Sequence, residues 1–321
     1  MRSVSVIIPC GGNARRMLPL SNINSKPFLP VLDSPLIVQT IKELKLIRNL
    51  KTLIFIVKNI EMENQISSLI KRQMKNLEVD LLFLYRKPEN DILDSIKITD
   101  PYINGDLVAI LMPDIFNFSY QTNILSEIVR ELEENDCKTM GIIGIALSDS
   151  DQKSNHSYYL ISKSGELKGI KLDRKNPIGI RSAGRYILPS YILRKAIEKI
   201  PYYTNRERKV EDIFNILIKW KMLTLVRFFG RISNVNTPQD LFNVNMIALK
   251  DKKLVNYFGT SYVKSSSIKK SIISSHTSII ESKLENCLVL PDTNVKNIIV
   301  KDSIIYENGI IPVYNKKGIK A

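Results

Sequence analysis

The residues best suited to hold a phosphate group fall between positions 6 and 31, where the chain reads VIIPCGGNARRMLPLSNINSKPFLPV. A short apolar stretch leads into Gly11 and Gly12, and glycines let backbone N–H groups approach a phosphate or a base closely. Arg16 could bind a triphosphate through its planar guanidinium, and Lys26 could supply a point charge to the same anion. Taken alone, two arginines after a loop are equally compatible with a solvated turn.

Two familiar phosphate-binding loops fit this segment less well. The chain contains no GxxxxGK[ST] motif, and its adjacent glycines lack the GxGxxG spacing of a dinucleotide-binding loop. The segment therefore indicates a phosphate site built on a different loop.

Strands and helices are expected to alternate over the first 120 residues. Apolar runs and helical periods predict strands at 4–8, 53–57, 81–85 and 107–112 and helices at 35–50 and 64–74. This alternation favours a parallel sheet covered on both faces, in which ligands bind beyond the carboxyl ends of the strands. We therefore expect the loops after Ile8, Tyr85 and Met112 to converge on one cleft.

The middle of the chain has a more mixed pattern. It predicts a strand at 140–146, a hairpin from 158–162 and 167–172, helices at 190–200 and 211–220, and a strand at 223–229. Thr237 and Pro238 mark a further helix start, with the threonine as cap and the proline in the first turn.

Beyond about Lys250 short apolar pairs recur every five or six residues. Candidates to face inward lie six apart, at 273 and 279, 284 and 290, 289 and 295, and 299 and 305. This spacing is typical of a parallel β-helix, in which each coil repeats a short flat face. An ordinary β-meander is the alternative that the pattern leaves open.

The loop segment resembles the signature of nucleotidyltransferases that make nucleoside-diphosphate sugars, written GGxGTRLxPL followed by PKPxxPV. The chain reads GGNARRMLPL at 11–20 and SKPFLPV at 25–31. Further segments resemble motifs of the same family: LMPDIF at 111–116 is similar to LxGDxxF, GRY at 184–186 to GxY, and NVNTPQDL at 234–241 to D-x-GTPEDL. The resemblance covers essentially the whole chain.

The resemblance implies an α/β fold with a Rossmann-like, mostly parallel sheet as the nucleotidyltransferase domain and a C-terminal left-handed parallel β-helix. We expect the first domain to span residues 1–248 and the second to span residues 249–321. Since β-helix repeats offer flat faces that can be extended, we expect a homo-oligomer or a hetero-oligomer with a related subunit.

The resemblance also implies a reaction, in which a sugar-1-phosphate oxygen attacks the α-phosphorus of an NTP and pyrophosphate leaves. The protein positions the reactants and neutralises charge. Arg16 would stabilise the leaving pyrophosphate, Lys26 would contact phosphates at the reacting centre, and Asp114 would hold Mg²⁺ as the cofactor.

The binding residues follow from the same motifs. The residues implied for nucleotide binding are Gly11, Gly12, Asn13, Arg15, Lys87 and Asp91. Those implied for sugar-phosphate binding are Asp173, Gly184 and Arg174, with Lys171 in place of Arg174 if the register slips. Asp114 and Asn234 are the implied metal ligands.

Several positions depart from the family pattern. Ala14 replaces a loop glycine, and Asp91 stands where the base-binding segment has a glycine and could repel a triphosphate. Asn234 replaces the second metal aspartate, and Asn236 replaces the glycine after it. These changes could crowd the nucleotide or weaken metal binding.

Two hypotheses therefore stay open. The first is an active nucleotidyltransferase with an altered substrate preference, which the survival of Arg16, Lys26 and Asp114 favours. The second is a catalytically impaired homologue that binds nucleotide or sugar nucleotide as a regulatory or scaffolding subunit.

Composition bounds the partners. The net charge is +15, but the basic residues are spread over the whole chain, which favours a phosphate-handling site over nucleic-acid binding. No apolar run approaches the ~20 residues that span a bilayer, so we expect a cytoplasmic protein without membrane contact.

The three cysteines lie far apart, which argues against a zinc site or disulfides, and Cys10 is expected to be a small buried residue. His276 has no evident partner and is expected at the surface, not as a catalytic base.

Overall fold

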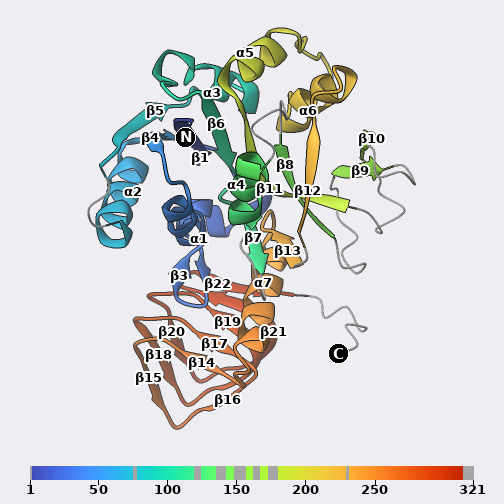
Figure 1. Ribbon diagram of the computed structural model, residues 1–321. Coiled ribbons are helices and arrows are strands. Elements are labelled where there is room, and N and C mark those ends of the chain that lie inside the picture. Colours follow the sequence, from blue (N-terminus) through green and yellow to red (C-terminus); the bar gives the residue numbers. More distant parts are fainter. Residues whose placement is uncertain are drawn as a thin grey trace. The chain divides into compact units, whose positions relative to one another are not determined.

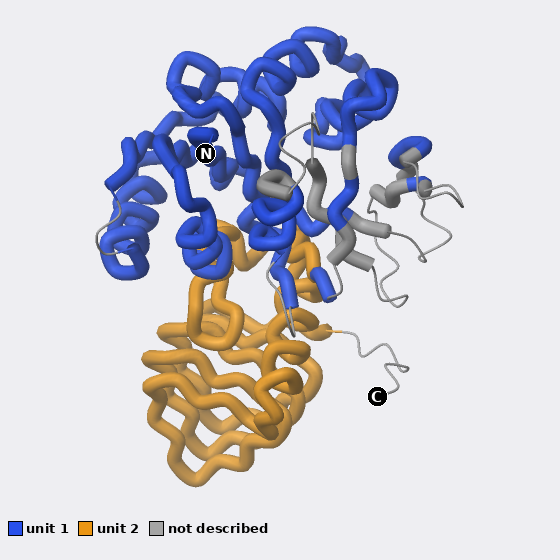
Figure 2. Tube along the Cα trace, viewed as in Figure 1, with its two compact units in different colours: residues 1–13, 38–232 blue, residues 14–37, 233–321 orange. Residues whose placement is uncertain are grey.

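The computed structural model describes residues 2–74, 78–118, 124–134, 142–147, 157–161, 167–172, 180–228 and 231–313. The chain folds into two compact units. Unit 1 comprises residues 1–13 and 38–232, and unit 2 comprises residues 14–37 and 233–321 (Figure 2). The division passes through the glycine-rich segment, between Asn13 and Ala14.

Unit 1 is built on a sheet whose first half is parallel (Figure 1). Its strands lie in the order β6 (Leu107–Leu111), β1 (Val4–Pro9), β4 (Leu50–Val57) and β5 (Asp80–Tyr85), and each pair of neighbours is parallel. Nearly every residue of β1, β4 and β6 is buried, because helices cover both faces. These strands confirm the parallel sheet expected from the apolar runs.

The other half of the sheet is antiparallel in its main pairings. β11 (Ile180–Pro189) runs antiparallel to β6 and to β8 (Ile142–Leu147), and β12 (Thr224–Phe228) is parallel to β8. β9 (Ser157–Ile161) and β10 (Leu167–Leu172) form the predicted antiparallel pair, whose connection at 162–166 lies outside the described residues. The sheet as a whole is therefore mixed.

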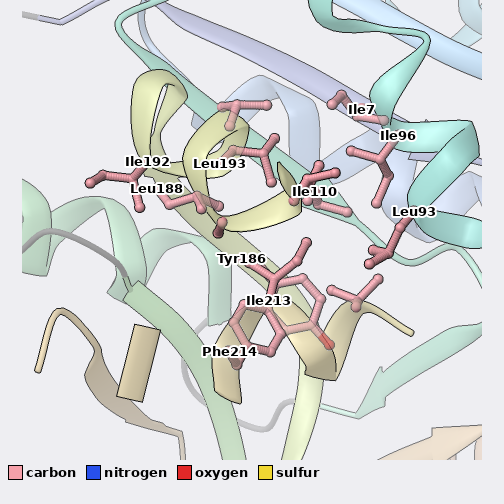
Figure 3. Close-up of a cluster of buried hydrophobic side chains, with 14 of the residues drawn as sticks. Ile7, Leu93, Ile96, Ile110, Tyr186, Leu188, Ile192, Leu193, Ile213 and Phe214 are labelled. Atoms are coloured by element: carbon pink, nitrogen blue, oxygen red, sulfur yellow. The ribbon is translucent and has the colours of Figure 1, made fainter. Parts of the chain in front are cut away.

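Helices α3 (Ile92–Lys97), α5 (Ser190–Glu198) and α6 (Val210–Lys219) pack on one face of this sheet (Figure 3). In this cluster the rings of Tyr186 of β11 and Phe214 of α6 pack against each other, with centroids 4.6 Å apart. The other helices of unit 1 are α1 (Ile37–Glu43, mostly in this unit), η4 (Leu44–Leu46), α2 (Ile60–Gln73), η5 (Asp100–Tyr102) and α4 (Ile124–Glu134). None of the helices in the described part of the chain has the length and apolar character needed to cross a bilayer.

Unit 2 begins with the segment of residues 14–37, which is folded into short turns. It contains η1 (Arg15–Met17), η2 (Leu20–Asn22), η3 (Lys26–Phe28) and the small antiparallel pair β2 (Pro30–Val31) and β3 (Ser34–Pro35). Helix α7 (Pro238–Asp251) follows β13 (Arg231–Asn234), and its start is as predicted. The Thr237 Oγ1 accepts the Asp240 N–H at 3.2 Å, while Asp240 accepts the Thr237 N–H at 2.9 Å.

The C-terminal strand array (residues 257–312) forms the rest of unit 2. Its strands are β14 (Tyr257–Phe258), β15 (Ser261–Lys264), β16 (Ser267–Lys269), β17 (Ile272–Ile273), β18 (Thr277–Ile280), β19 (Lys283–Val289), β20 (Asn294–Lys296), β21 (Ile299–Tyr306) and β22 (Gly309–Pro312). The pairing is parallel except between β21 and β22. Partners lie 15 residues apart between β14 and β17 and 16 apart in the other parallel pairs; for example, Ser261 opposes Thr277 and Lys283 opposes Ile299.

The array repeats its corners as well as its strands. Non-glycine residues with left-handed backbones stand at 265, 270, 276, 281, 286, 292, 297 and 302, which gives three corners in each 16 residues. A hydroxyl follows several corners and joins neighbouring repeats. For example, Ser266 donates to the Lys264 carbonyl at 2.8 Å and accepts the Ser282 N–H at 3.0 Å.

The array interior is apolar, with Ile273, Ile279, Leu284, Val289, Val295 and Ile305 buried as predicted. The prediction that Ile299 faces inward is wrong, because 84% of this residue is exposed. It opposes the exposed Lys283 at the start of its strand, so the alternation of side chains turns Val300 inward instead.

A buried ion pair joins three parts of unit 1. Arg185 of β11 is fully buried, and its Nε lies 2.5 Å from the Glu43 Oε2 of α1. The guanidinium also donates to the Thr40 hydroxyl at 3.2 Å and to the Met112 carbonyl at 2.8 Å. Because both charges lie in a low-dielectric interior, each depends on the other.

We expect Arg185→Met to lower the free energy of unfolding by about 3–5 kcal/mol, because it leaves Glu43 buried without its partner. The double variant Arg185→Met with Glu43→Leu should lose less than the sum of the single changes. Urea denaturation followed by circular dichroism measures both. Arg194→Met, which breaks an ion pair whose partners are each about half exposed, should change stability by less than about 1 kcal/mol. Additive losses in the double variant would contradict the buried pairing.

Candidate active site

The carboxyl ends of β1, β5 and β6 converge in unit 1, as the sequence predicted. Arg86, just after β5, donates from Nη1 to the carbonyl of Gly11, just after β1, at 3.1 Å. Burial raises the pKa of the Cys10 thiol, and the charge of Asp114, which follows β6, raises it further. Three loops that are distant in sequence therefore meet at one edge of the sheet.

The two loop glycines differ in their surroundings. A Cβ on Gly11 would lie 3.1 Å from the Val57 carbonyl carbon and oxygen and 3.3 Å from the Arg86 Cβ, so Gly11 is needed for packing. A Cβ on Gly12 would meet no protein atom within 4 Å. Gly12 and the following Asn13 are both exposed, so their backbone is accessible to a ligand.

The arginines of the signature lie in unit 2 and face solvent. Arg15 and Arg16 are exposed on η1, while Met17 of the same turn is fully buried and anchors it. Ala14, just before η1, has φ of 48°, a left-handed conformation that glycine adopts without strain. Alanine in place of glycine at position 14 therefore strains the backbone, in addition to adding a Cβ that takes up space.

Lys26 opens η3 in the same unit. Pro27 and Phe28 are buried beside it, whereas Lys26 itself is half-buried. Its Nζ donates to the Asn236 Oδ1 at 2.9 Å. Asn234, the predicted metal ligand, is half-buried at the end of β13.

Asp114 lies in the turn between β6 and β7 (Ile115–Phe118) and is half-buried. Gly184 supports this turn: its carbonyl accepts the Met112 N–H at 2.8 Å. Gly184 has φ of +68°, and a Cβ there would lie 2.5 Å from the Ile115 Cδ1. The conformation and the close approach both require glycine at this position.

Lys87 and Asp91 lie in the loop after β5. Lys87 is exposed, and its carbonyl accepts the Asn90 N–H at 3.1 Å. Asp91 caps α3 and is buried, with its Oδ1 accepting the Asp94 N–H at 2.9 Å and its Oδ2 accepting from Arg208 Nε at 2.7 Å. Its carboxylate therefore has partners within the protein.

Arg208 pairs with both Asp91 and Asp94, and the three residues form a second charge cluster in unit 1. Burial lowers its pKa, but hydrogen bonds to Asp91 and Asp94 raise it above the usual range as the net effect. The guanidinium carbon lies 3.6 Å from the centroid of the Tyr202 ring, and the Tyr202 hydroxyl donates to Asp94 at 2.8 Å. The cluster fixes the start of α3 next to the predicted base-binding loop.

The structure thus describes most of the predicted site residues but divides them between its units. Gly11, Gly12, Asn13, Lys87, Asp91, Asp114 and Gly184 belong to unit 1, and Arg15, Arg16, Lys26 and Asn234 belong to unit 2. Asp173 and Arg174 lie outside the described residues. Sequence reasoning missed Arg86, Arg185 and Glu43, since no local motif marks a residue whose partner is distant in the chain.

In open α/β sheets ligands bind beyond the carboxyl ends of the strands, and the exposed glycine loop of this chain follows β1 at that edge. The model of the family described as nucleotidyl transferase matches residues 5–251. The chain belongs to this family, which confirms the resemblance to sugar-phosphate nucleotidyltransferases.

Curated relatives are similar over most of the chain. A UTP–glucose-1-phosphate uridylyltransferase of Mycoplasma genitalium is 23% identical over 274 residues, covering 77% of this chain and 92% of that protein. The bifunctional protein GlmU of Methanococcus aeolicus is 23% identical and covers 78% of this chain, which spans 56% of GlmU.

Solved structures share the fold. An apo UDP-glucose pyrophosphorylase has a TM-score of 0.64 at 17% identity, covering 79% of this chain and all of that one. A UTP-bound UGPase from Acinetobacter baumannii has a TM-score of 0.62 at 17% identity, covering 79% of this chain and 96% of that one. Several of the relatives are named as UTP–glucose-1-phosphate uridylyltransferases, and nucleotidyltransferases of this family generally use a divalent metal.

The two loop glycines give a matched test. Gly12→Ala should leave thermal stability unchanged and weaken nucleotide binding by about tenfold, because its Cβ would meet only a ligand. Gly11→Ala should lower stability by about 1–3 kcal/mol through crowding. Calorimetric melting and titration with an NTP measure both. Unchanged nucleotide affinity in Gly12→Ala would remove Gly12 from the binding site.

Gly184→Ala should destabilise the protein by about 2–4 kcal/mol, because it combines backbone strain with a clash against Ile115. Gly169→Ala is the control, since a Cβ there meets nothing within 4 Å. Thermal melting of both variants measures the difference. Equal melting temperatures would contradict the packing of Gly184 against the Asp114 turn.

Proposed function

We propose that this protein transfers a nucleotidyl group from an NTP to a sugar-1-phosphate, with Mg²⁺ as cofactor, giving an NDP-sugar and pyrophosphate. The observation that carries the proposal is the exposed Gly12 and Asn13 backbone, beyond β1 of a family fold, with the exposed Arg15 and Arg16 following in the sequence. Backbone N–H groups and guanidinium groups together suit a triphosphate.

The reaction is a displacement at phosphorus. A phosphate oxygen of the sugar-1-phosphate forms a bond to the α-phosphorus, and the bond to the pyrophosphate oxygen breaks. Arg16 and Lys26 would offset the negative charge that develops on the phosphates. Asp173, Arg174 and Gly184 remain our proposal for the sugar-phosphate side.

Mg²⁺ suits the oxygen donors of the two ligands that the resemblance implies. Asp114 offers a carboxylate and Asn234 an amide oxygen, and hard cations prefer such ligands. When bound, Mg²⁺ would neutralise phosphate charge, while Gly184 and Arg185 keep the Asp114 turn in place.

The sugar and base are proposed from the relatives. Because UTP and glucose-1-phosphate occur in the names of several of them, this pair is the first to test. We also propose that residues 249–321 form a left-handed β-helix domain after a catalytic domain of residues 1–248, that the protein is oligomeric, and that it is cytoplasmic. The parallel strands with a 16-residue repeat support the β-helix.

A catalytically impaired, nucleotide-binding regulatory or scaffolding subunit is the second candidate function. Asn234 favours it, since an amide brings no charge to a metal. Ala14 favours it as well, because its Cβ stands where the resembling motif has a glycine. Nucleotide binding without turnover would distinguish this function from the first.

The test is pyrophosphate release from UTP, ATP, GTP, CTP or dTTP with a panel of sugar-1-phosphates and Mg²⁺. We expect release with one pairing, reduced at least ~100-fold in Lys26→Ala and in Asp114→Ala. Lys42→Ala and Asp100→Ala, at positions outside the site, are controls and should retain activity. Activity that survives both site substitutions would refute the roles of Lys26 and Asp114. Binding without release would favour the regulatory subunit.

A further inference from the structure

Helix α7 holds the segment of residues 14–37 at two places, all within unit 2. Just before the helix, Asn236 accepts a hydrogen bond from the Lys26 ammonium at 2.9 Å. Further along, Asn245 accepts the Leu32 N–H at 2.6 Å and donates to the Pro30 carbonyl at 2.9 Å. The two asparagines therefore contact the start and the end of one short stretch that carries Lys26.

Both asparagines are themselves fixed. The Asn236 N–H donates to the Asp240 carboxylate at 3.1 Å, and the same carboxylate closes the capping box with Thr237. Asn245 is fully buried, and its Nδ2 also donates to the Leu241 carbonyl of its own helix at 2.9 Å. A rigid helix thus supports both contacts, which is what precise positioning requires.

The turn that Asn245 holds needs such support. Leu32 has φ of 56°, a conformation that a side chain adopts only when its surroundings impose it. On the other side of the turn, the Asp33 carboxylate accepts hydrogen bonds from the Ser275 N–H, at 3.0 Å, and from its hydroxyl. The C-terminal strand array and α7 therefore both hold the same hairpin.

The chemistry of the Asn236 contact suits a cation that must bind phosphate. Lysine has a long flexible stem, so an acceptor at its end reduces the freedom lost when an anion binds. An amide oxygen is neutral, and it therefore orients the ammonium without cancelling its charge. A carboxylate at position 236 would orient Lys26 equally well but would compete with the phosphate for its charge.

We propose that Asn236 and Asn245 are positioning residues for the catalytic cation Lys26, with α7 as their platform. Asn236 orients the ammonium, and Asn245 fixes the backbone of the hairpin that follows Lys26. Helix α7 thereby contributes to phosphate binding without contacting the phosphate itself. This inference rests on the proposed function, because it assigns the contacts a role only if Lys26 binds phosphate.

The test is a double-variant cycle on nucleotide affinity, measured by calorimetry with the full chain, Mg²⁺ and whichever common NTP the wild type binds. Asn236→Ala should weaken binding by about tenfold in the wild-type background and not at all in Lys26→Ala. Asn236→Asp should weaken binding at least as much, despite keeping an acceptor for Lys26. An equal loss in both backgrounds would overturn the role of Asn236.

Asn245 is tested in the same way, with a matched control on the same helix. Asn245→Ala should weaken binding several-fold in the wild-type background only. Asn243→Ala removes an amide oxygen that accepts a hydrogen bond from the Gln239 side chain at 3.0 Å, and it should leave nucleotide affinity unchanged. If Asn245→Ala does not fold, Asn245→Asp replaces it, because it keeps the acceptor for Leu32 and loses the donor to Pro30. Unchanged affinity in the folded variant would overturn the role of Asn245.

The cycle also separates this inference from the proposed function. If the wild type binds nucleotide but releases no pyrophosphate, the transferase proposal fails and the cycle still decides the positioning roles. If pyrophosphate is released but Asn236 and Lys26 act independently, only the positioning roles fail. If no nucleotide binds, both proposals are overturned.

Discussion

The buried guanidinium of Arg185 is the interaction on which unit 1 most depends. It ties β11 to α1 through Glu43, and it holds the Met112 carbonyl at the end of β6. A charged pair at this depth is stable only while both charges are present, because removing either one leaves the other buried and unpaired. The turn that carries Asp114 begins at this carbonyl. The contacts of Arg185 therefore help to fix both the position of the predicted metal ligand and the stability of the sheet.

The sequence predicted the fold correctly where a segment had a clear apolar pattern or a clear helix-start signal. β1, β4 and β6 are continuous apolar runs because both faces of each strand are covered, and α7 begins where Thr237 and Pro238 indicate. The strand array was harder to predict in detail. Its repeat is 16 residues, because two intervals of five residues and one of six separate the corners of each repeat. The six-residue spacing therefore predicted most of the inward positions correctly but placed Ile299 wrongly.

The candidate site shows a similar contrast between local and distant signals. Gly12, Arg16, Lys26 and Asp114 could be proposed because their spacing is local. The contacts that fix them join residues far apart in the chain, such as Lys26 with Asn236 or Glu43 with Arg185, and neither composition nor periodicity reveals such pairs. Arg86 was missed for the same reason, since its role depends on a carbonyl 75 residues earlier.

The departures from the family motif are not equally serious in physical terms. Asp91 raised the concern of repelling a triphosphate, but Arg208 and the start of α3 occupy its carboxylate, which offsets much of that charge. Asn236 replaces a glycine yet gives Lys26 an acceptor that no glycine side chain could provide. Ala14 carries a real backbone cost, of about 1–2 kcal/mol, for its left-handed conformation. Asn234 removes a negative charge from the predicted metal site, so the choice between transferase and regulatory subunit depends mainly on whether a single carboxylate suffices for the metal.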